Sequence, residues 1–323
     1  MLLAGDIGGT KTLLGLFEAE SPRPRAVAVR SFVTLEYDDL AAIVTEFTRD
    51  RAVASGAVEV ACFGVAGPVI NGTAELTNVP WRVDAPQIAE TFGFHRVDLL
   101  NDLQAMAYSL TVLDDSEVCV LQDGDAGRGG NIGLIGAGTG LGLAMLHSVD
   151  GRYEPMASEG GHADFAARTE REIRLLRWLT ERYGRAEVEG VVSGRGLLNI
   201  YRVTHDTPCA VDVDLQMPDA AARITMAGLE RRCAGCVEAL DLFVEAYGAE
   251  AGNLALRTVS TGGLFVGGGI APKILPALTD GRFMRAFRSK APFEALLSAI
   301  AVKVILNPEA ALLGAAVYAA SRR

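Results

Sequence analysis

The stretch Gly5-Asp6-Ile7-Gly8-Gly9-Thr10-Lys11-Thr12 decides the fold, because it joins two short apolar segments. The second segment, Thr12 to Phe17, is bounded by polar residues and is typical of a strand rather than a helix. The order is therefore strand, glycine-rich turn, strand. Glycines in such a turn leave backbone N–H groups open to an anion such as phosphate.

Two further glycine-rich turns follow apolar runs, at Gly136 to Gly142 and at Gly267-Gly268-Gly269. Thr10 stands before Lys11 where a Walker loop needs Gly, and no turn has the Gly-x-Gly-x-x-Gly spacing of a dinucleotide fingerprint. A single turn of this kind is usually only structural. Three in this order favour two similar half-molecules that clamp a nucleotide.

The composition sets limits on the class of protein. A chain of 323 residues is long enough for two domains with a large core. The net charge of −10 disfavours nucleic acid as a partner, because such binding requires Lys and Arg against the phosphates. Charges interrupt the long apolar stretches, and the N-terminus enters the first strand without a signal peptide, so we expect no membrane association. The five Cys are typical of reduced thiols in a cytoplasmic protein.

Cys233 and Cys236 form the single Cys-x-x-Cys of the chain, without the second pair of a zinc ribbon. Together with Leu229, Leu240 and Phe243 they recur at helical spacing. We therefore expect buried thiols within one helix rather than a metal or redox site.

Strands and helices alternate along the chain, as in an α/β protein. Asp84, with Gln87 three residues later, is a capped helix start, and Asn307-Pro308-Glu309 opens a final helix with a stripe of small residues that permits close packing. The segment 168–256 is predicted to be mostly helical. We expect strands at 26–34, 58–66, 97–100, 118–122, 132–135 and 142–147, and helices at 38–54, 84–91 and 103–113.

Two polar clusters stand out. Asn101-Asp102 follows a strand, where α/β sheets place their ligands, although Asp102 could also be only a helix N-cap. In Glu159-Gly160-Gly161-His162 the small residues let a carboxylate and an imidazole converge on one ligand, and a carboxylate can accept from two vicinal hydroxyls. An isolated Glu or His in a loop is more often solvated surface.

In the order and spacing of its motifs the whole chain resembles the bacterial glucokinase family, within the sugar kinase, Hsp70 and actin superfamily. The resemblance implies an actin-like ATPase fold of two α/β domains with a ligand cleft between them. Because the C-terminal helix of that family returns to the first domain, it implies a small discontinuous domain, 1–112 plus 303–323, and a larger one, 113–302, with a helical insertion. The motifs are Gly5 to Thr10, Leu76-Thr77-Asn78, Asn101-Asp102, Gly136 to Gly142, Glu159 to His162, Val191 to Gly194 and Gly267 to Pro272.

The resemblance implies a glucokinase that transfers the ATP γ-phosphate to the 6-hydroxyl of D-glucose. Asp102 would be the general base that accepts the hydroxyl proton. Glu189 aligns with the third sugar-binding acid of the family, and Glu187 is close enough for a register error to exchange the two. The implied sugar-binding residues are Asn78, Asn101, Asp102, Glu159, His162 and Glu189.

On the nucleotide side, the resemblance implies ATP and Mg²⁺, with Asp6 holding Mg²⁺ through water. Mg²⁺ keeps several waters and needs few carboxylates, so no dense ligand cluster is expected. A homodimer is also an expectation from the family. The implied nucleotide-binding residues are Asp6, Gly8, Gly9, Thr10, Gly138, Thr139, Gly267, Gly268 and Gly269.

Lys11 departs from the pattern of the glucokinase family, in which many members have Asn at this position. The related repressor and kinase class commonly has Gly-Gly-Thr-Lys, as this chain does. That class adds a Cys-rich zinc motif shortly after the Glu-x-Gly-His motif, and this chain has no Cys between 120 and 208. Four residues precede the first turn, so we expect no DNA-binding helix-turn-helix ahead of it. A kinase of another hexose or amino sugar, ADP or polyphosphate as donor, and a catalytically silent sugar-responsive regulator remain alternatives.

Overall fold

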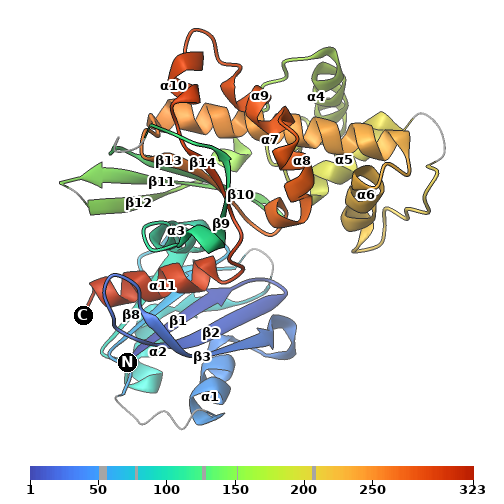
Figure 1. Ribbon diagram of the computed structural model, residues 1–323. Helices are drawn as coiled ribbons and strands as arrows, with labels where there is room; N and C mark the ends of the chain where they lie inside the picture. The colour runs from blue at the N-terminus through green and yellow to red at the C-terminus, as the bar shows by residue number, and fades with distance from the viewer. Residues whose placement is uncertain (51–56, 77–78, 126–128, 151, 206–208) are drawn as a thin grey trace. The chain divides into compact units, whose positions relative to one another are not determined.

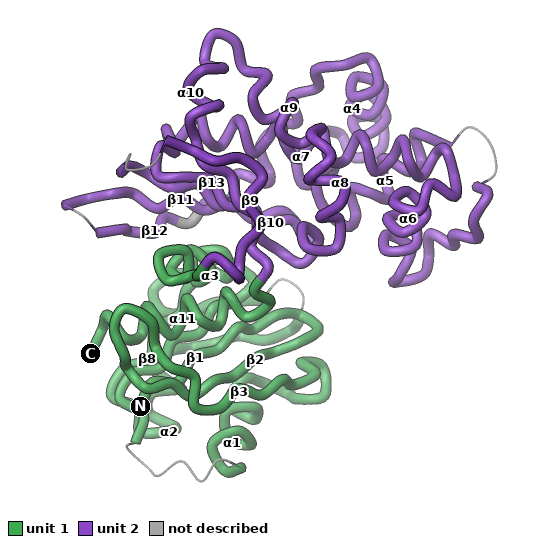
Figure 2. The backbone as a smooth tube through the Cα atoms, viewed as in Figure 1, with its two compact units in different colours: residues 1–114, 307–323 green, residues 115–306 purple. Residues whose placement is uncertain are grey.

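The computed structural model describes residues 1–50, 57–76, 79–125, 129–150, 152–205 and 209–323. The chain divides into two compact units, Met1–Asp114 with Asn307–Arg323 (unit 1) and Asp115–Leu306 (unit 2) (Figure 2). Unit 1 begins with β1 (Leu2–Ile7) and β2 (Lys11–Glu18), which pair antiparallel. The predicted order of strand, turn and strand is confirmed.

Unit 1 is built on a sheet of five strands in the order β3-β2-β1-β4-β8, with β3 at Arg25–Val33, β4 at Val60–Val65 and β8 at Arg96–Asn101. Strands β1, β4 and β8 are parallel. A short three-stranded sheet of β5 (Val69–Ile70), β6 (Thr73–Glu75) and β7 (Arg82–Asp84) was not expected from the sequence. Runs of two or three residues are too short to show a period of two.

Helices cover both faces of the unit 1 sheet (Figure 1). Ile43 and Phe47 of α1 (Leu40–Asp50) pack on Leu3, Ile7 and other residues of one face. Alternate residues of β1 face the other way, where α3 (Asp102–Ser109) and α11 (Ala310–Ser321) pack. The stripe of small residues on α11 packs closely against another element, as predicted, and that element is α3. Helix α11 begins at Ala310, three residues after the predicted cap Asn307. Helix α2 (Ala85–Phe92) starts at its predicted cap, where Asp84 accepts from the Gln87 backbone N–H.

Unit 2 contains a six-stranded sheet in the order β12-β11-β10-β13-β14-β9, of which β10, β13 and β14 are parallel. Residues 303–306 belong to this unit and not to the first domain, contrary to the prediction, because β14 pairs with β13 and β9. The strand bounds are β9 Val118–Gln122, β10 Ile132–Ala137, β11 Leu141–Val149, β12 Arg152–Ser158, β13 Gly263–Gly267 and β14 Val302–Ile305.

The predicted helical region of unit 2 is confirmed, and its long α7 is buried along much of its length against the sheet and the neighbouring helices. The helices are α4 (Glu170–Tyr183), α5 (Gly194–Thr204), α6 (Ala220–Leu229), α7 (Ala234–Thr258), α8 (Leu275–Thr279), α9 (Arg282–Arg288) and α10 (Glu294–Ser298). The 3-10 turns of the chain are η1 (Thr34–Glu36), η2 (Asp115–Glu117), η3 (Gly160–His162) and η4 (Ala271–Ile274). Among the described residues, no helix combines the length and apolar character needed to cross a membrane.

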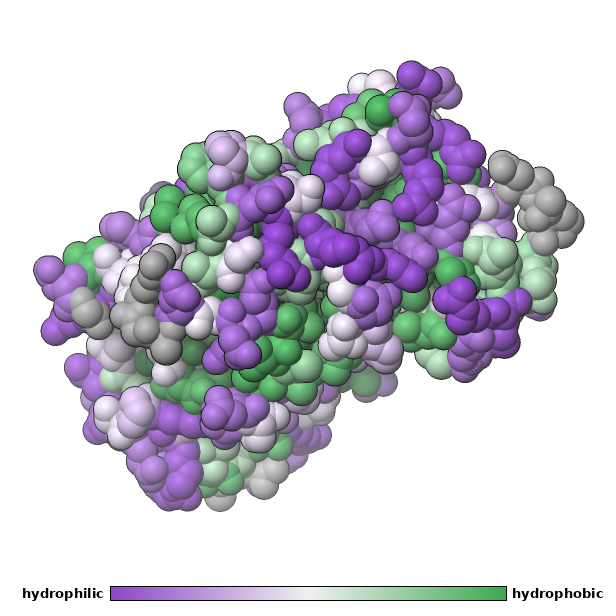
Figure 3. Space-filling view, turned by 45° about the horizontal axis from the view of Figure 1, so that its top comes forward, coloured by the Kyte–Doolittle hydropathy of each residue, from purple (hydrophilic) through white to green (hydrophobic). Residues whose placement is uncertain are grey.

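The two units repeat one topology. In each, a hairpin is followed across the sheet by two parallel strands, so that β3-β2-β1-β4-β8 of unit 1 corresponds to β12-β11-β10-β13-β14 of unit 2. Similar half-molecules were expected from the glycine-rich turns, and this duplicated sheet is that of the actin-like ATPase fold. Hydrophilic residues cover much of the face seen in Figure 3, in keeping with a chain that carries 40 acidic side chains.

Candidate functional site

Asp6 and Asp102 lie at one edge of the unit 1 sheet. In the parallel register Asp6 aligns with Gly64, and Val65 aligns with Asn101, so β1, β4 and β8 end together. Asp102 is the first residue of α3, directly after β8. The fold thus brings together two carboxylates that are far apart in the sequence, at the edge where such sheets carry their ligands.

Asn101, not Asp102, is the N-cap of α3. Its Oδ1 accepts from the backbone N–H groups of Leu103 (3.0 Å) and Gln104 (3.4 Å), and its Nδ2 donates to Gly67 O (3.4 Å). The N-cap position is therefore that of Asn101, although Asp102 Oδ1 also accepts from Leu103 N–H (2.7 Å). Asn101 holds the start of α3 and keeps a second amide hydrogen available for a ligand.

The pKa of Asp6 is raised from 3.8 to about 7, chiefly because the surrounding protein removes water from the carboxyl group. The negative charge of Asp102 raises this pKa further, and Lys11 lowers it. A carboxylate that is destabilised in this way gains from a nearby cation. Asp6 therefore fits a metal ion that keeps most of its water ligands, as Mg²⁺ does.

We expect Asp6→Asn to stabilise the protein, and more so at high pH. Between about pH 4 and pH 7 the native state binds a proton at Asp6 that the unfolded chain does not, so wild-type stability falls as pH rises through this window. Asn does not titrate, so the advantage of the variant should grow by on the order of 3 kcal/mol from about pH 5 to about pH 8. Thermal unfolding in magnesium-free buffer measures this.

The control is Asp38→Asn, which changes an exposed carboxylate of the same unit and should shift the melting temperature little at any pH. A melting difference between Asp6→Asn and the wild type that stays constant with pH would contradict the raised pKa.

The first glycine-rich turn is tied to the strand beside it. Gly8 N–H donates to Lys11 O (3.1 Å), and Thr34 binds the turn twice, from its hydroxyl to Gly8 O (2.8 Å) and from its N–H to Thr10 O (3.1 Å). Thr34 was not recognised from the sequence. These bonds fix the turn while Thr10 and Lys11 stay exposed, so the turn can meet an anion without rearranging.

In unit 2 the other two glycine-rich turns lie at one edge of the sheet, since Gly136 aligns with Gly267. Ile270 N–H donates to Ala137 O (3.1 Å), and Thr139 is exposed at the tip of its turn. Gly268 has φ +81°, and a Cβ there would lie 2.4 Å from Ala137 O, so only glycine fits.

The hydroxyl group of Tyr247, in α7, binds the backbone at the ends of both strands. This role of Tyr247 was not predicted from the sequence. Its hydroxyl is fully buried, accepts from Ala137 N–H (3.1 Å) and lies 3.3 Å from Gly267 O. Burial raises the pKa of this phenol, so it remains a neutral hydrogen-bonding group.

Glu159 and His162 lie beside a second loop of unit 2. Backbone bonds join the two loops, from Val188 N–H to Ala163 O (2.9 Å) and from Glu189 N–H to Gly161 O (2.8 Å). As a result His162, Glu187 and Glu189 offer ligand atoms within 4.8 Å of one another. Sequence motifs that stand well apart along the chain therefore form one polar cluster.

Within this cluster Glu187 and Glu189 have different partners. Glu187 binds His162 Nδ1 (3.1 Å) and Arg195 (3.0 Å), so both of its oxygens are engaged by side chains. Glu189 accepts from Leu141 N–H (2.9 Å), next to the Gly138-Thr139 turn, and its other oxygen lies 3.4 Å from Arg195. Glu189 thus connects the polar cluster to that turn, whereas Glu187 is bound to His162. Arg195 was not predicted, although it directly follows Ser193-Gly194.

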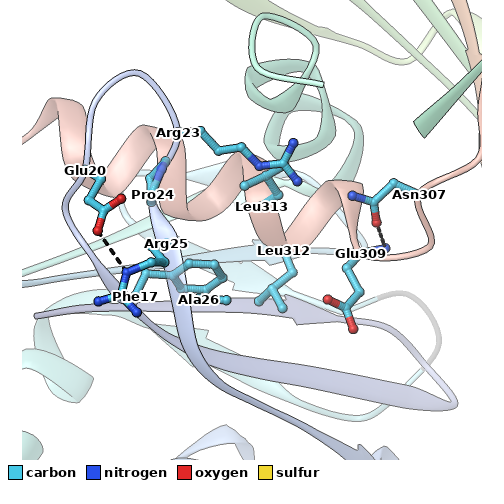
Figure 4. Close-up of a pocket in the computed structure, with 10 residues that line it drawn as sticks. All are labelled: Phe17, Glu20, Arg23, Pro24, Arg25, Ala26, Asn307, Glu309, Leu312 and Leu313. Atoms are coloured by element: carbon cyan, nitrogen blue, oxygen red, sulfur yellow. Dashed lines mark hydrogen bonds and ion pairs between the residues drawn. The ribbon is translucent and has the colours of Figure 1, made fainter. Parts of the chain in front are cut away.

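Asn78 lies outside the described residues. A pocket of about 350 Å³ in unit 1 lies elsewhere, between the loop after β2 and the start of α11 (Figure 4). Phe17 and Leu312 line it, and Asn307 there accepts from Glu309 N–H (2.7 Å). Phe17 is at the end of β2 opposite to Lys11, so this pocket is separate from the edge that carries Asp6 and Asp102.

Comparisons with known proteins agree with one another. The family model described as Glucokinase matches residues 3–322. A glucokinase of Synechocystis is 40% identical over an alignment of 345 positions, which covers 98% of this chain and 97% of that protein. A glucokinase crystal structure from an Antarctic psychrotroph has a TM-score of 0.87 and 28% identity, and the match covers 99% of this chain and 98% of that one. A ROK family glucokinase from Streptomyces griseus, solved with glucose and AMPPNP, is 22% identical with a TM-score of 0.63 over 99% of each chain, and shares the fold.

Proposed function

The chain belongs to the glucokinase family, and from that premise we propose that it transfers the γ-phosphoryl group of ATP to the 6-hydroxyl of D-glucose. The observation that carries the proposal is the pair of strand edges, one in each unit, at which glycine-rich turns stand beside acidic side chains. Phosphoryl transfer needs little covalent chemistry from the protein, and backbone turns with a few carboxylates can supply the positioning and the charge.

Asp102 is the general base of the proposed reaction. It accepts the proton of the 6-hydroxyl while the oxygen of that hydroxyl bonds to the γ-phosphorus and the bond to the β-phosphate oxygen breaks. Its position supports this role, because it begins α3 with its backbone fixed by the Asn101 cap. Much of the value of such a base is its placement within hydrogen-bond reach.

The sugar hydroxyls are bound by Asn78, Asn101, Asp102, Glu159, His162 and Glu189 in this proposal. Glu189 is favoured over Glu187 as the third acid because it binds Leu141 N–H, beside the Gly138-Thr139 turn. Glu187 would instead orient His162 through Nδ1. A carboxylate that accepts from two neighbouring hydroxyls selects for a sugar with a particular arrangement of these groups.

The turns at Gly8-Gly9-Thr10 and Gly138-Thr139 bind the phosphates in this proposal, and the Gly267-Gly268-Gly269 turn lies beside the adenosine. Asp6 would hold Mg²⁺ through water, and this ion would supply positive charge against the phosphates. ATP as donor is supported by the AMPPNP complex of the Streptomyces griseus protein. We also infer a homodimer, from the resemblance to the family. The free cysteines favour a cytoplasmic location.

A coupled assay of sugar 6-phosphate formation, with ATP and Mg²⁺, tests the proposal over glucose, mannose, fructose and N-acetylglucosamine. We expect strong selectivity for glucose. If another sugar were preferred, the proposed mechanism would stand and the proposed substrate would be revised. If glucose bound but was not phosphorylated with ATP, ADP or polyphosphate as donor, the result would contradict the proposed kinase activity. It would favour a sugar-responsive regulator.

A further inference from the structure

Four side chains of unit 2, outside the proposed active site, converge on one point. They are His205, at the end of α5, Cys209 in the following segment, and Cys233 and Cys236, at the start of α7. Their ligand atoms all lie within 4.8 Å of one another. Three thiols and one imidazole are a frequent ligand set of structural zinc sites.

Four of the six distances between these atoms are known individually, and they are within about 0.4 Å of those of a tetrahedron around zinc. Cys209 Sγ lies 3.4 Å from Cys233 Sγ and 3.7 Å from Cys236 Sγ. His205 Nε2 lies 3.4 Å from Cys233 Sγ and 3.8 Å from Cys236 Sγ. Tetrahedral zinc, with its usual bond lengths to sulfur and nitrogen, requires about 3.8 Å between two sulfurs and about 3.6 Å between sulfur and nitrogen. We propose that His205, Cys209, Cys233 and Cys236 bind one structural Zn²⁺.

The imidazole of His205 is oriented for this role. Its Nδ1 lies 3.0 Å from the backbone carbonyl oxygen of Tyr201, which makes Nδ1 the protonated nitrogen and leaves the Nε2 lone pair directed at the cysteines. A backbone carbonyl on the distal nitrogen is a usual partner of a zinc-binding histidine. The ring also stacks on Tyr201, with centroids 3.7 Å apart.

The backbone around the cluster accommodates the four ligands closely. A Cβ at Gly235 would lie 2.6 Å from His205 Nε2, so the absence of a side chain there lets the imidazole reach the thiols. The backbone N–H groups of Cys236 and Ala210 bond to the Cys233 sulfur, and Val211 N–H donates to Cys209 Sγ (3.5 Å). Such bonds, together with the N-terminus of α7, stabilise negative charge on the sulfurs when a metal ion binds.

Cys233 and Cys236 are buried, as expected, but they do not lie in one continuous helix with Leu229. Helix α6 ends at Leu229 and α7 begins at Ala234, so the Cys-x-x-Cys stands at a helix start, where both sulfurs can face one point. The missing second pair of ligands is supplied by His205 and Cys209, from before α6. All five cysteines are free thiols, which is the form that zinc requires.

The proposed zinc would join the end of α5 to the start of α7 and close the segment that contains α6. Helix α5 begins at Gly194, whose N–H donates to Gly138 O (2.9 Å), next to the glycine-rich turn. With 11 residues at about 1.5 Å each, α5 holds the metal roughly 16 Å from that end. The zinc therefore stabilises the helices that support the site and takes no part in the chemistry.

The test measures metal content in protein that carries no histidine tag, purified without chelators from zinc-supplemented medium. We expect one Zn²⁺ per chain by elemental analysis. Replacement by Co²⁺ should give the intense visible bands of tetrahedral cobalt and the charge-transfer absorption of cobalt thiolates. The absorption of cobalt thiolates separates this site from the sulfur-free cluster of His162, Glu187 and Glu189.

Cys209→Ser should weaken zinc binding at least about tenfold in a chelator competition, because a thiolate ligand is lost. The matched control is Cys119→Ser, in β9, which should keep full zinc content. Wild-type protein with zinc at background level, or with octahedral cobalt, would overturn the proposal, and so would a disulfide between Cys209 and Cys233 found by mass spectrometry. If Cys209→Ser does not fold, the wild-type stoichiometry and cobalt spectrum decide. None of these readouts depends on sugar kinase activity.

Discussion

Asp102→Asn is expected to lower kcat by about 10²- to 10⁴-fold while glucose still binds. The amide cannot accept the proton of the 6-hydroxyl as a carboxylate does. It can keep the local structure, because the oxygen of Asn can still accept from Leu103 N–H, as Asp102 Oδ1 does at 2.7 Å. Steady-state kinetics with ATP and glucose, together with glucose binding by calorimetry, separates a loss of chemistry from a loss of binding.

The matched control is Asp98→Asn, the same change on β8 at a carboxylate that pairs with Arg96 at the surface. It should leave kcat unchanged. The Asp102→Asn variant should also have a lower pKa at Asp6, since Asp102 contributes to raising it. Undiminished turnover in Asp102→Asn would remove this residue as the base, and the raised pKa of Asp6 would then need another role.

Glu189→Gln is expected to raise the KM for glucose by about 10- to 100-fold, because charge-assisted hydrogen bonds to sugar hydroxyls are worth about 1.5–3 kcal/mol. The amide oxygen of Gln can retain the bond from Leu141 N–H, so the turn at Gly138-Thr139 should stay in place. The KM for ATP should therefore change little. Sugar and ATP titrations in the coupled assay measure both constants.

Glu187→Gln is the paired variant, two residues away on the same loop. It removes the negative charge beside His162 Nδ1 and Arg195, but a neutral amide can still bind both groups. We therefore expect a rise in the KM for glucose of less than about tenfold. A larger effect from Glu187→Gln than from Glu189→Gln would exchange their roles. If Glu189→Gln raised the KM for ATP as much as the KM for glucose, Glu189 would act mainly by holding the Gly138-Thr139 turn.

The sequence predicted those features that depend on neighbouring residues. The Asp84 cap of α2 follows from a carboxylate three residues before a backbone N–H, and the antiparallel pairing of β1 and β2 follows from a short glycine-rich turn between apolar runs. These interactions span few residues, so local spacing determines them.

Other features required the tertiary structure. Spacing alone could not separate Asn101 from Asp102 as the cap, nor give the different partners of Glu187 and Glu189. Adjacent or alternate residues fit the same pattern, and only their contacts differ.

The sequence by itself determined the duplicated α/β fold, the family and the residues that stand at the strand ends. The tertiary structure alone decided that Asp6 and Asp102 share one edge, that Tyr247 and Thr34 hold the turns, and that His205 and Cys209 meet the Cys-x-x-Cys across α6. The physical reason is that these contacts join segments distant in sequence. Their distances are set by sheet register and helix packing, which no short stretch of the chain encodes.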